Sequence, residues 1–183
     1  MKWIVGGILA AIVGYAGYLV NYLGALKTVK LSEGEASVMY LLGKEHVGPY
    51  HKIVPTINEV ENWAREKKID CTRSFGLYLD NPAQVEEARM KSWGGCVVEA
   101  ASLGDLPEGF VIQEFSAPYF VKAVFEGSPG IGPMKVYPKV EKYFAEKNLA
   151  RLPRVLEVYI VHSQTAMTTT YYFPAEKPAQ VSP

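Results

Sequence analysis

The chain has 183 residues, 49% of them hydrophobic, and a formal net charge of zero at pH 7. This composition predicts one folded domain of ordinary size plus an appendage, and it excludes a disordered chain. The only charged residues among the first 30 are lysines, so the remainder is mildly acidic. Such a body has no general attraction for phosphate backbones, and we expect no nucleic-acid partner.

An uncharged stretch near the N-terminus, WIVGGILAAIVGYAGYLVNYLGAL (residues 3–26), predicts a membrane anchor. It exceeds the roughly 20 residues that cross a bilayer as a helix. A cleaved signal peptide is the alternative, but the apolar run is long for one and no clean cleavage site precedes Lys27. We therefore expect a single-pass membrane protein. Lysines flank both ends of the span, so the positive-inside rule barely separates the two orientations, and we expect a cytosolic body.

The rest of the chain divides into a short linker, one domain and a tail. Residues 1–30 are expected to hold the anchor and the start of a polar linker, KTVKLSEGEA, and residues 177–183 a flexible tail. Between them, at 31–176, apolar residues recur at helical spacing in 55–69 and 137–149. Strands are expected at 37–43, 74–80, 92–101, 110–115, 119–127, 154–162 and 167–174.

The two expected helices belong to a repeated pattern. INEVENWAREKKI (57–69) overlays YPKVEKYFAEKNL (137–149) with four identities, and each is preceded and followed by strands. At an offset of 81, Gly76 falls on Glu157 and Tyr78 falls on Tyr159. The pattern predicts an α+β domain built from a duplicated strand-helix-strand-strand unit, with an antiparallel sheet and two helices on one face.

The strand sequence VLEVYIV (155–161) separates into two faces. The period of two places Glu157 and Tyr159 on one face, and the aliphatic Leu156 and Val158 on the other. We expect the aliphatic face to meet the helices, which would leave Glu157, Tyr159 and Tyr78 on the wall of a cleft on the opposite face. Gly76 would leave that cleft open.

A carboxylate among tyrosines suits two kinds of chemistry. It attracts a flat, lipophilic cation, to which the rings add cation–π contacts. Alternatively, Glu157 acts as a general base on water while Tyr159 stabilises a leaving oxygen. The third interpretation is a solvated sheet face whose tyrosines are ordinary strand formers. Trp93, beside Gly94, and Tyr50, after Pro49, are further candidates for the cleft.

No metal site or cofactor is expected. Cys71 and Cys96 match no metal-ligand spacing, and neither do His46, His51 and His162. The two cysteines would pair in a secreted body and remain thiols in a cytosolic one.

The layout of two such units, with YLDNP after the first helix and PRVLEVY after the second, resembles the gyrase-inhibitor-like small-molecule-binding superfamily. That group includes the effector-binding domains of bacterial multidrug-responsive regulators. The likeness is closest to membrane-anchored members related to the animal testis-expressed endoplasmic-reticulum autophagy receptor. The resemblance implies a ligand cleft in which Glu157 faces cationic or aromatic compounds. Some soluble members hydrolyse cyclopropane-bearing compounds with such a glutamate.

The resemblance has limits. The C-terminal PAEKPAQVSP lacks a motif for autophagy proteins, and an anchor replaces the regulators' DNA-binding domain. We therefore expect a membrane-tethered module for amphiphilic, cationic or aromatic ligands. A hydrolase of electrophilic xenobiotics is the first alternative, and an adaptor for an unidentified protein partner is the second.

Overall fold

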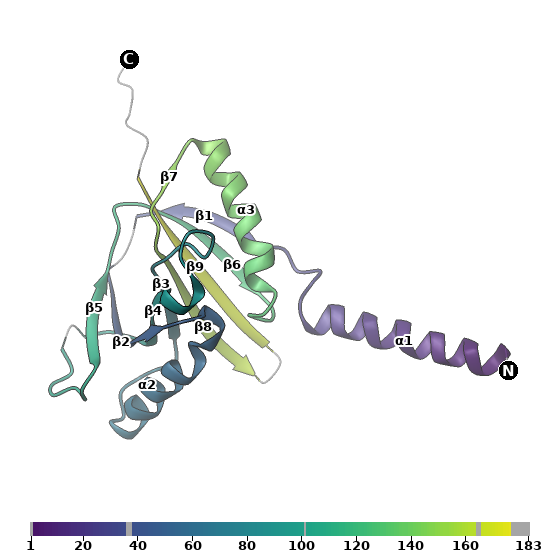
Figure 1. Cartoon of the computed structure of the whole chain (residues 1–183), viewed down its shortest axis with the longest axis horizontal. Helices are drawn as coiled ribbons and strands as arrows, with labels where there is room; N and C mark the ends of the chain where they lie inside the picture. The colour runs from purple at the N-terminus through teal and green to yellow at the C-terminus, as the bar shows by residue number, and fades with distance from the viewer. Residues whose placement is uncertain (1, 36–37, 101, 164–165, 177–183) are drawn as a thin grey trace, which may run out of the picture.

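The computed structural model describes residues 2–35, 38–100, 102–163 and 166–176, and the expected tail at 177–183 lies outside these ranges. The described body is an antiparallel sheet with the strand order β1-β6-β9-β8-β3-β4-β2-β5, and the short β7 pairs with β9. Two helices, α2 and α3, lie on one face of the sheet, and α1 projects from the body (Figure 1). The α+β class and the antiparallel sheet are confirmed.

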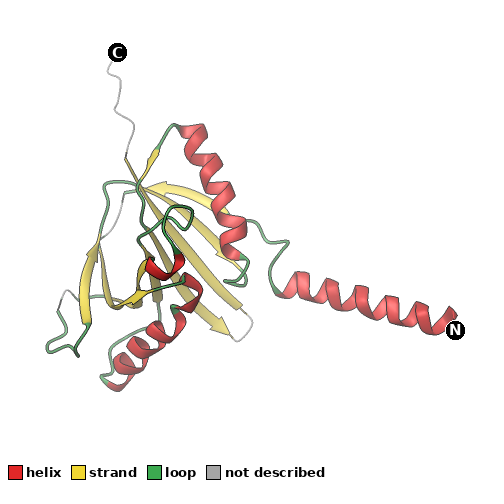
Figure 2. Ribbon diagram, viewed as in Figure 1, coloured by secondary structure: helices red, strands yellow, loops and turns green. Residues whose placement is uncertain are grey.

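The elements follow each other in the order that Figure 2 shows by type. The helices are α1 (Lys2–Tyr22), α2 (Val54–Glu66) and α3 (Gly132–Lys147). The strands are β1 (Lys30–Gly34), β2 (Met39–Val47), β3 (Ser74–Tyr78), β4 (Lys91–Val98), β5 (Phe110–Phe115), β6 (Phe120–Glu126), β7 (Ala150–Arg151), β8 (Val155–Ser163) and β9 (Ala166–Glu176).

The centre of the sheet is the pair β3 and β8. Their antiparallel register places Gly76 directly opposite Glu157. From this pair, β4, β2 and β5 extend to one edge, and β9, β6 and β1 extend to the other. Both halves therefore place their elements in the same spatial order around the central pair.

Both helices bury an apolar stripe against the sheet. Val60 of α2 packs on Leu42 of β2, and Val140 of α3 packs in the cluster that holds Phe125 of β6. Burial of one such side chain stabilises the fold by roughly 1.5–3 kcal/mol. A side chain at Gly94 would come within 2.7 Å of Ile57, so this glycine allows α2 to lie close on the sheet.

Helix α3 begins earlier than the spacing of its apolar residues predicts. It starts at Gly132 rather than at Tyr137, and Pro133 occupies its first turn. Proline is compatible with this position because the first amide groups of a helix have no intrahelical acceptor.

The aliphatic face of the central strands does not meet the helices, and our prediction on this point is wrong. Its core cluster contains, within the described ranges, no residue of α2 or α3. Phe115 and Phe120, whose rings stack 5.5 Å apart, contribute to this cluster instead. The other buried members are Leu41, Phe75, Leu77, Val97, Leu156 and Val158. Glu157 therefore faces the helices, and the cleft must be sought on that side.

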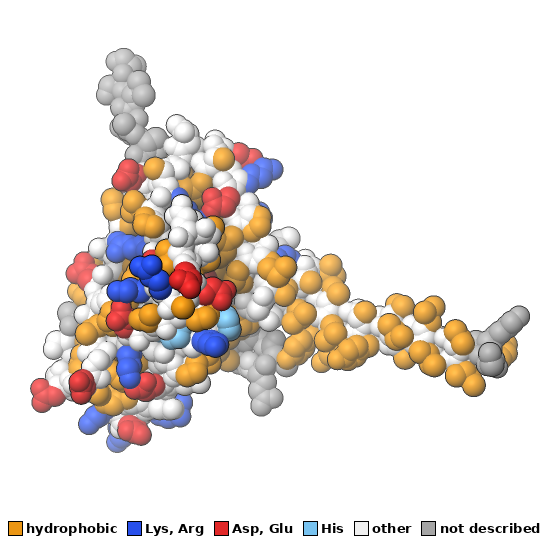
Figure 3. All heavy atoms as spheres, viewed as in Figure 1, with side chains coloured by type: hydrophobic (Ala, Val, Ile, Leu, Met, Phe, Trp, Pro, Cys, Tyr) orange, Lys and Arg blue, Asp and Glu red, His pale blue; other side chains and the backbone are white. Residues whose placement is uncertain are grey.

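The N-terminal helix carries hydrophobic side chains along its length and stands clear of the body (Figure 3). Residues Trp3–Tyr22 are long and apolar enough to cross a membrane, with no part of the span buried in the protein. A signal sequence near the N-terminus meets the same criteria of length and composition. The structure thus agrees with the expected span without fixing the side on which the body lies.

The expected linker is partly a strand. β1 pairs with β6 along its whole length, from Lys30 opposite Val124 to Gly34 opposite Phe120. Its sequence is polar because it is an edge strand whose residues are mostly exposed, and edge strands are commonly charged. Alternation of apolar residues could not reveal it.

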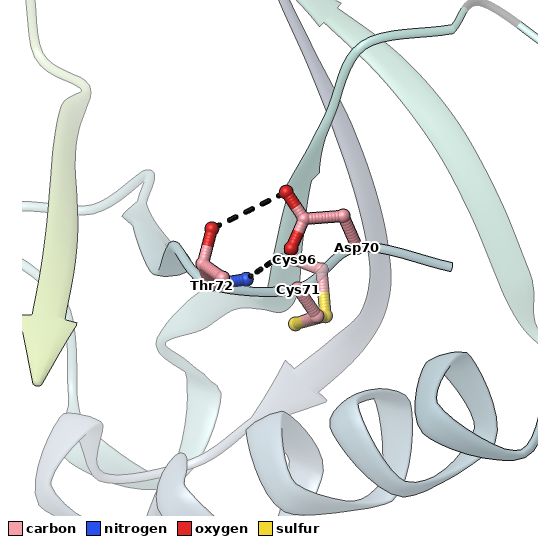
Figure 4. Close-up of a disulfide and its surroundings, with 4 residues drawn as sticks. All are labelled: Asp70, Cys71, Thr72 and Cys96. Atoms are coloured by element: carbon pink, nitrogen blue, oxygen red, sulfur yellow. Dashed lines mark hydrogen bonds between the residues drawn. A yellow bond between two sulfur atoms is a disulfide. The ribbon is translucent and has the colours of Figure 1, made fainter. Parts of the chain in front are cut away.

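The two cysteines form a disulfide (Figure 4). Cys71 follows α2 and Cys96 lies in β4, with 5.2 Å between their Cα atoms, within the normal range for such bonds. Beside them, the Asp70 carboxylate accepts hydrogen bonds from the Thr72 amide (3.2 Å) and hydroxyl (3.3 Å). The bond therefore fastens the loop after α2 to the sheet.

Candidate functional site

A cavity of about 1310 Å³ lies between α2 and α3, above the central strands. Its floor includes Glu157 and Tyr159 from β8 and Tyr78 from β3. Pocket volumes of 300–1,000 Å³ are usual for small molecules, so this one admits a bulky ligand. Most of the wall is apolar, formed by Ile53, Val54, Ile57, Pro82, Pro129, Pro133, Met134, Pro138, Leu152, Pro153, Val155, Val161 and Met167.

Tyrosine hydroxyls surround the Glu157 carboxylate, which is only 6% exposed. Tyr159 donates a hydrogen bond to Oε2 at 3.0 Å, and Tyr137 of α3 donates to Oε1 at 3.4 Å. The Tyr78 hydroxyl lies 2.9 Å from that of Tyr159. Since Tyr159 gives its proton to the carboxylate, Tyr78 donates to Tyr159, and a chain of hydrogen bonds leads to Glu157.

Burial is the main cause of the pKa shift of the Glu157 carboxyl. Loss of water raises the pKa of the Glu157 carboxyl from its ordinary 4.5 to about 7, although the hydrogen bonds from Tyr159 and Tyr137 oppose the rise. Burial, and the negative charge of Glu157, raise the pKa of Tyr78, Tyr137 and Tyr159 above the ordinary tyrosine value. The tyrosines therefore remain hydrogen-bond donors at neutral pH, while the carboxylate changes charge near pH 7.

Gly76 accommodates Tyr78 rather than the cavity. A side chain at Gly76 would come within 2.7 Å of the Tyr78 hydroxyl, because the ring folds back over this position on the same strand face. Tyr50 packs against the other side, with 4.7 Å between the two ring centroids. The Tyr50 hydroxyl donates to the Asp80 carbonyl at 3.0 Å and accepts from the Asp80 amide at 2.8 Å.

The polar part of the wall favours positive charge. Carboxylates of Glu61, Asp80 and Glu141 line the cavity together with Glu157. Arg151 is also in the wall, but its guanidinium forms an ion pair with Glu141 and lies over the Tyr137 ring.

A backbone acceptor adds to this character. Pro138, inside α3, has no amide hydrogen, so the Met134 carbonyl four residues earlier lacks its usual helical donor. Both residues line the cavity.

The structure brings most of the predicted site residues together. Glu157, Tyr159, Tyr78 and Tyr50 all line the cavity, with Gly76 beneath the Tyr78 ring. Trp93 is placed elsewhere: it pairs with Leu77 in register and packs on the cluster of the opposite face, away from the cavity.

Tyr137 is the functional residue that sequence reasoning missed. It overlays Ile57 in the repeat, and both line the cavity from equivalent helices. The overlay contained this signal, but placing the helices on the face opposite the cleft removed them from consideration. Within the described ranges, no group of three or more His, Cys, Asp and Glu side chains is arranged to hold a metal ion.

Comparison with known proteins supports a shared fold and family. The family model described as the GyrI-like small molecule binding domain matches residues 35–176. A DNA gyrase inhibitor from Pectobacterium carotovorum subsp. carotovorum (strain PC1) is 33% identical over 58 residues. That match covers 31% of this chain and 38% of the relative, so the chain matches well under half of the relative's length.

Solved structures share the architecture at low sequence identity. The crystal structure of the EcmrR C-terminal domain gives a TM-score of 0.63 at 14% identity, covering 82% of this chain and 99% of that one. The structure of SAV2435 bound to tetraphenylphosphonium gives 0.50 at 12% identity, covering 80% and 94%. At these identities the likeness establishes the fold alone.

Proposed function

Because this chain belongs to the GyrI-like small-molecule-binding domain family, we propose that it is a membrane-tethered module for amphiphilic, cationic or aromatic ligands. One observation carries the proposal. Glu157 is buried on the floor of a large cavity, and both of its carboxylate oxygens accept hydrogen bonds from neutral tyrosines. A buried carboxylate without a cationic partner is unstable, and a cationic ligand supplies that partner.

The dimensions and the rings favour a bulky aromatic cation. A volume of about 1310 Å³ exceeds what a small ammonium ion fills. Tyr78, Tyr137 and Tyr159 line the cavity around the carboxylate. Aromatic rings attract cations placed over a face within about 6 Å. SAV2435, of the same fold, was solved with tetraphenylphosphonium, a cation of this class. The match supports the choice of this compound as the first probe.

The test is a titration of the full chain, held in lipid nanodiscs, with tetraphenylphosphonium at pH 6 and pH 8. The probe keeps its charge over this range, so only the protein titrates. With a pKa of about 7, Glu157 is ionised to about 9% at pH 6 and about 91% at pH 8. We expect affinity to rise about tenfold between these pH values.

Three comparisons make this titration decisive. Glu157→Gln should lose most of the affinity and its pH dependence, whereas Glu66→Gln, the same change at an exposed carboxylate of α2 outside the cavity, should keep both. The neutral triphenylphosphine oxide should bind the wild type weakly at either pH. Equal binding of the cation to wild type and Glu157→Gln would overturn the proposal.

A hydrolase is the second candidate because Glu157 has a pKa of about 7, close to the value that suits a general base at neutral pH. In this scheme the carboxylate removes a proton from water as the water oxygen adds to an electrophilic substrate, and Tyr159 donates to the leaving oxygen. Product formed at saturating substrate by the wild type, and abolished in Glu157→Gln, would establish it. An adaptor, in contrast, would not depend on Glu157.

The membrane tether rests on α1, whose apolar span Trp3–Tyr22 is exposed. On the same ground we place the chain with the membrane-anchored members of the superfamily. A duplicated strand-helix-strand-strand unit accounts for the matching order of elements on either side of β3 and β8.

The disulfide bears on the side of the membrane. A cytosolic body was expected from a small difference in flanking lysines, yet Cys71 and Cys96 are paired. Disulfides persist in oxidising compartments and are rare in the cytosol. We therefore favour a body on the non-cytosolic side, and a reporter fused to the C-terminus that is active on only one side of the membrane tests this orientation.

A further inference from the structure

The end of α1 is joined to the body at one place. The Leu23 carbonyl accepts a hydrogen bond from the Ser128 amide at 3.0 Å, just before α3. The backbone at Gly24 lies so close to Gly127 that an added Cβ would come within 3.0 Å of its Cα. Lys135, in the first turns of α3, donates to the Ala25 carbonyl. The segment that follows α1 therefore contacts the body at the N-terminal end of α3, and this end would lie where α1 leaves the bilayer.

The same end of α3 forms part of the cavity wall. Pro129 and Met134 line the cavity within a few residues of Ser128. Met167, at the start of β9, lines it as well, and its carbonyl accepts a hydrogen bond from the Gly127 amide at 3.1 Å. In Figure 1, α1 leaves the body beside this end of α3.

Exposed aliphatic side chains border the cavity. Met134 is 76% exposed, Val161 is 60% exposed and Val54, at the start of α2, is 55% exposed, and all three line the cavity. Leu26, just beyond α1, is also exposed. Exposed apolar side chains that border one site indicate a surface that contacts a protein or a membrane.

We propose that the cavity opens onto the lipid bilayer, with Met134, Val161 and Val54 as a rim in contact with the membrane surface. This inference rests on the proposed function and names the source of the ligand: amphiphilic cations that have already partitioned into the bilayer enter the cavity from the lipid phase. The bilayer is the partner of this rim because α1 holds the adjoining loop at the membrane. An amphiphilic cation concentrates in the headgroup region, with its apolar part in the hydrocarbon.

The test places an environment-sensitive fluorophore on single introduced cysteines of the full chain in nanodiscs, with the native disulfide left oxidised. Met134→Cys reports on the rim, and Leu26→Cys is the positive control next to the span. Val111→Cys is the negative control, because β5 is the strand at the sheet edge opposite β1 and lies far from α1 in Figure 1. Lipids that carry a nitroxide near the headgroup serve as the quencher.

We expect the fluorophores at 134 and 26 to be quenched at least threefold more strongly than the one at 111. Quenching at 134 no stronger than at 111 overturns the proposal, as does equal quenching at all three positions, which would mean that the whole body lies on the lipid. Tetraphenylphosphonium binding is measured in parallel on the unlabelled wild-type chain in the same nanodiscs. Binding without quenching at 134 refutes the membrane-facing rim alone, and quenching without binding refutes the proposed function alone.

Discussion

Replacing Glu157 by Gln should change how the stability of the ligand-free protein depends on pH. The substitution keeps the size of the side chain and its capacity to accept a hydrogen bond from Tyr159, which lies 3.0 Å away. It removes the ionisation, and its amide nitrogen is a donor at the position of the oxygen that accepts from Tyr137. Any difference between the two proteins that grows with pH is therefore attributable to the buried charge.

The sign follows from the direction of the pKa shift. The folded state raises the pKa of Glu157 from 4.5 to about 7, so between these values it binds a proton that the unfolded chain has released. The stabilising contribution of this group is complete below about pH 4.5 and is lost as pH rises through 7. At 1.36 kcal/mol per pH unit, the loss amounts to about 3 kcal/mol.

Thermal unfolding of the full chain in nanodiscs, followed by tryptophan fluorescence, measures this difference. Wild type and Glu157→Gln should unfold at similar temperatures at pH 5, and the variant should be more stable at pH 8 by roughly 6–12 °C. The control variant Glu66→Gln should follow the wild type throughout. A constant difference between wild type and Glu157→Gln from pH 5 to pH 8 would refute the assignment of a buried, neutral carboxyl.

Three further substitutions test neighbouring parts of the site and fold. Tyr159→Phe removes a hydrogen bond that lowers the pKa of Glu157, so the midpoint of the tetraphenylphosphonium pH profile should move upward by up to about one pH unit; an unchanged midpoint would argue against this contact. Gly76→Ala places a methyl group within 2.7 Å of the Tyr78 hydroxyl and should displace that ring, weakening binding of the probe while lowering stability by only about 1 kcal/mol; retained affinity would show that the ring position is irrelevant. Cys71→Ser opens a disulfide between residues 25 apart and should lower the free energy of unfolding by about 3 kcal/mol under oxidising conditions, with little difference from the wild type once reductant is added.

The repeat in the sequence and the register of the central strands coincide at one residue pair. Gly76 overlays Glu157 at the offset of 81 and also lies opposite it in the structure. Because β3 and β8 are antiparallel, Tyr78 lies opposite Val155 and not opposite Tyr159, which it overlays in the sequence. Glu157, Tyr159 and Tyr78 therefore share a face, as the period of two predicts.

The side on which the helices lie could not be predicted in the same way. An aliphatic face indicates burial, but it does not say what covers it. Here Leu156 and Val158 are buried in one cluster with Phe115 and Phe120. Among the residues that the structure describes, this cluster contains none from α2 or α3. The helices instead enclose a face with a carboxylate and tyrosines, which is unusual for a core and is consistent with the ligand-binding function that we propose. Trp93 was misplaced for a different reason: the register of β4 against β3 puts it opposite Leu77, on the aliphatic face.

The affinity for a cation and the stability of the ligand-free fold both depend on the charge of Glu157. We expect the affinity to rise with pH and the stability to fall. As pH rises through 7, Glu157 loses its proton and the ligand-free fold becomes less stable, but the charged form is the one that a cation prefers. Ligand stabilises the folded state by RT ln(1 + [L]/Kd), so a tenfold gain in affinity adds about 1.4 kcal/mol when the ligand is well above its Kd. At a fixed, high concentration of tetraphenylphosphonium, the rise in unfolding temperature should therefore be larger at pH 8 than at pH 6. In Glu157→Gln it should be small and equal at both. A wild-type rise that is larger at pH 6 would contradict a carboxylate that holds the cation, even if the probe binds.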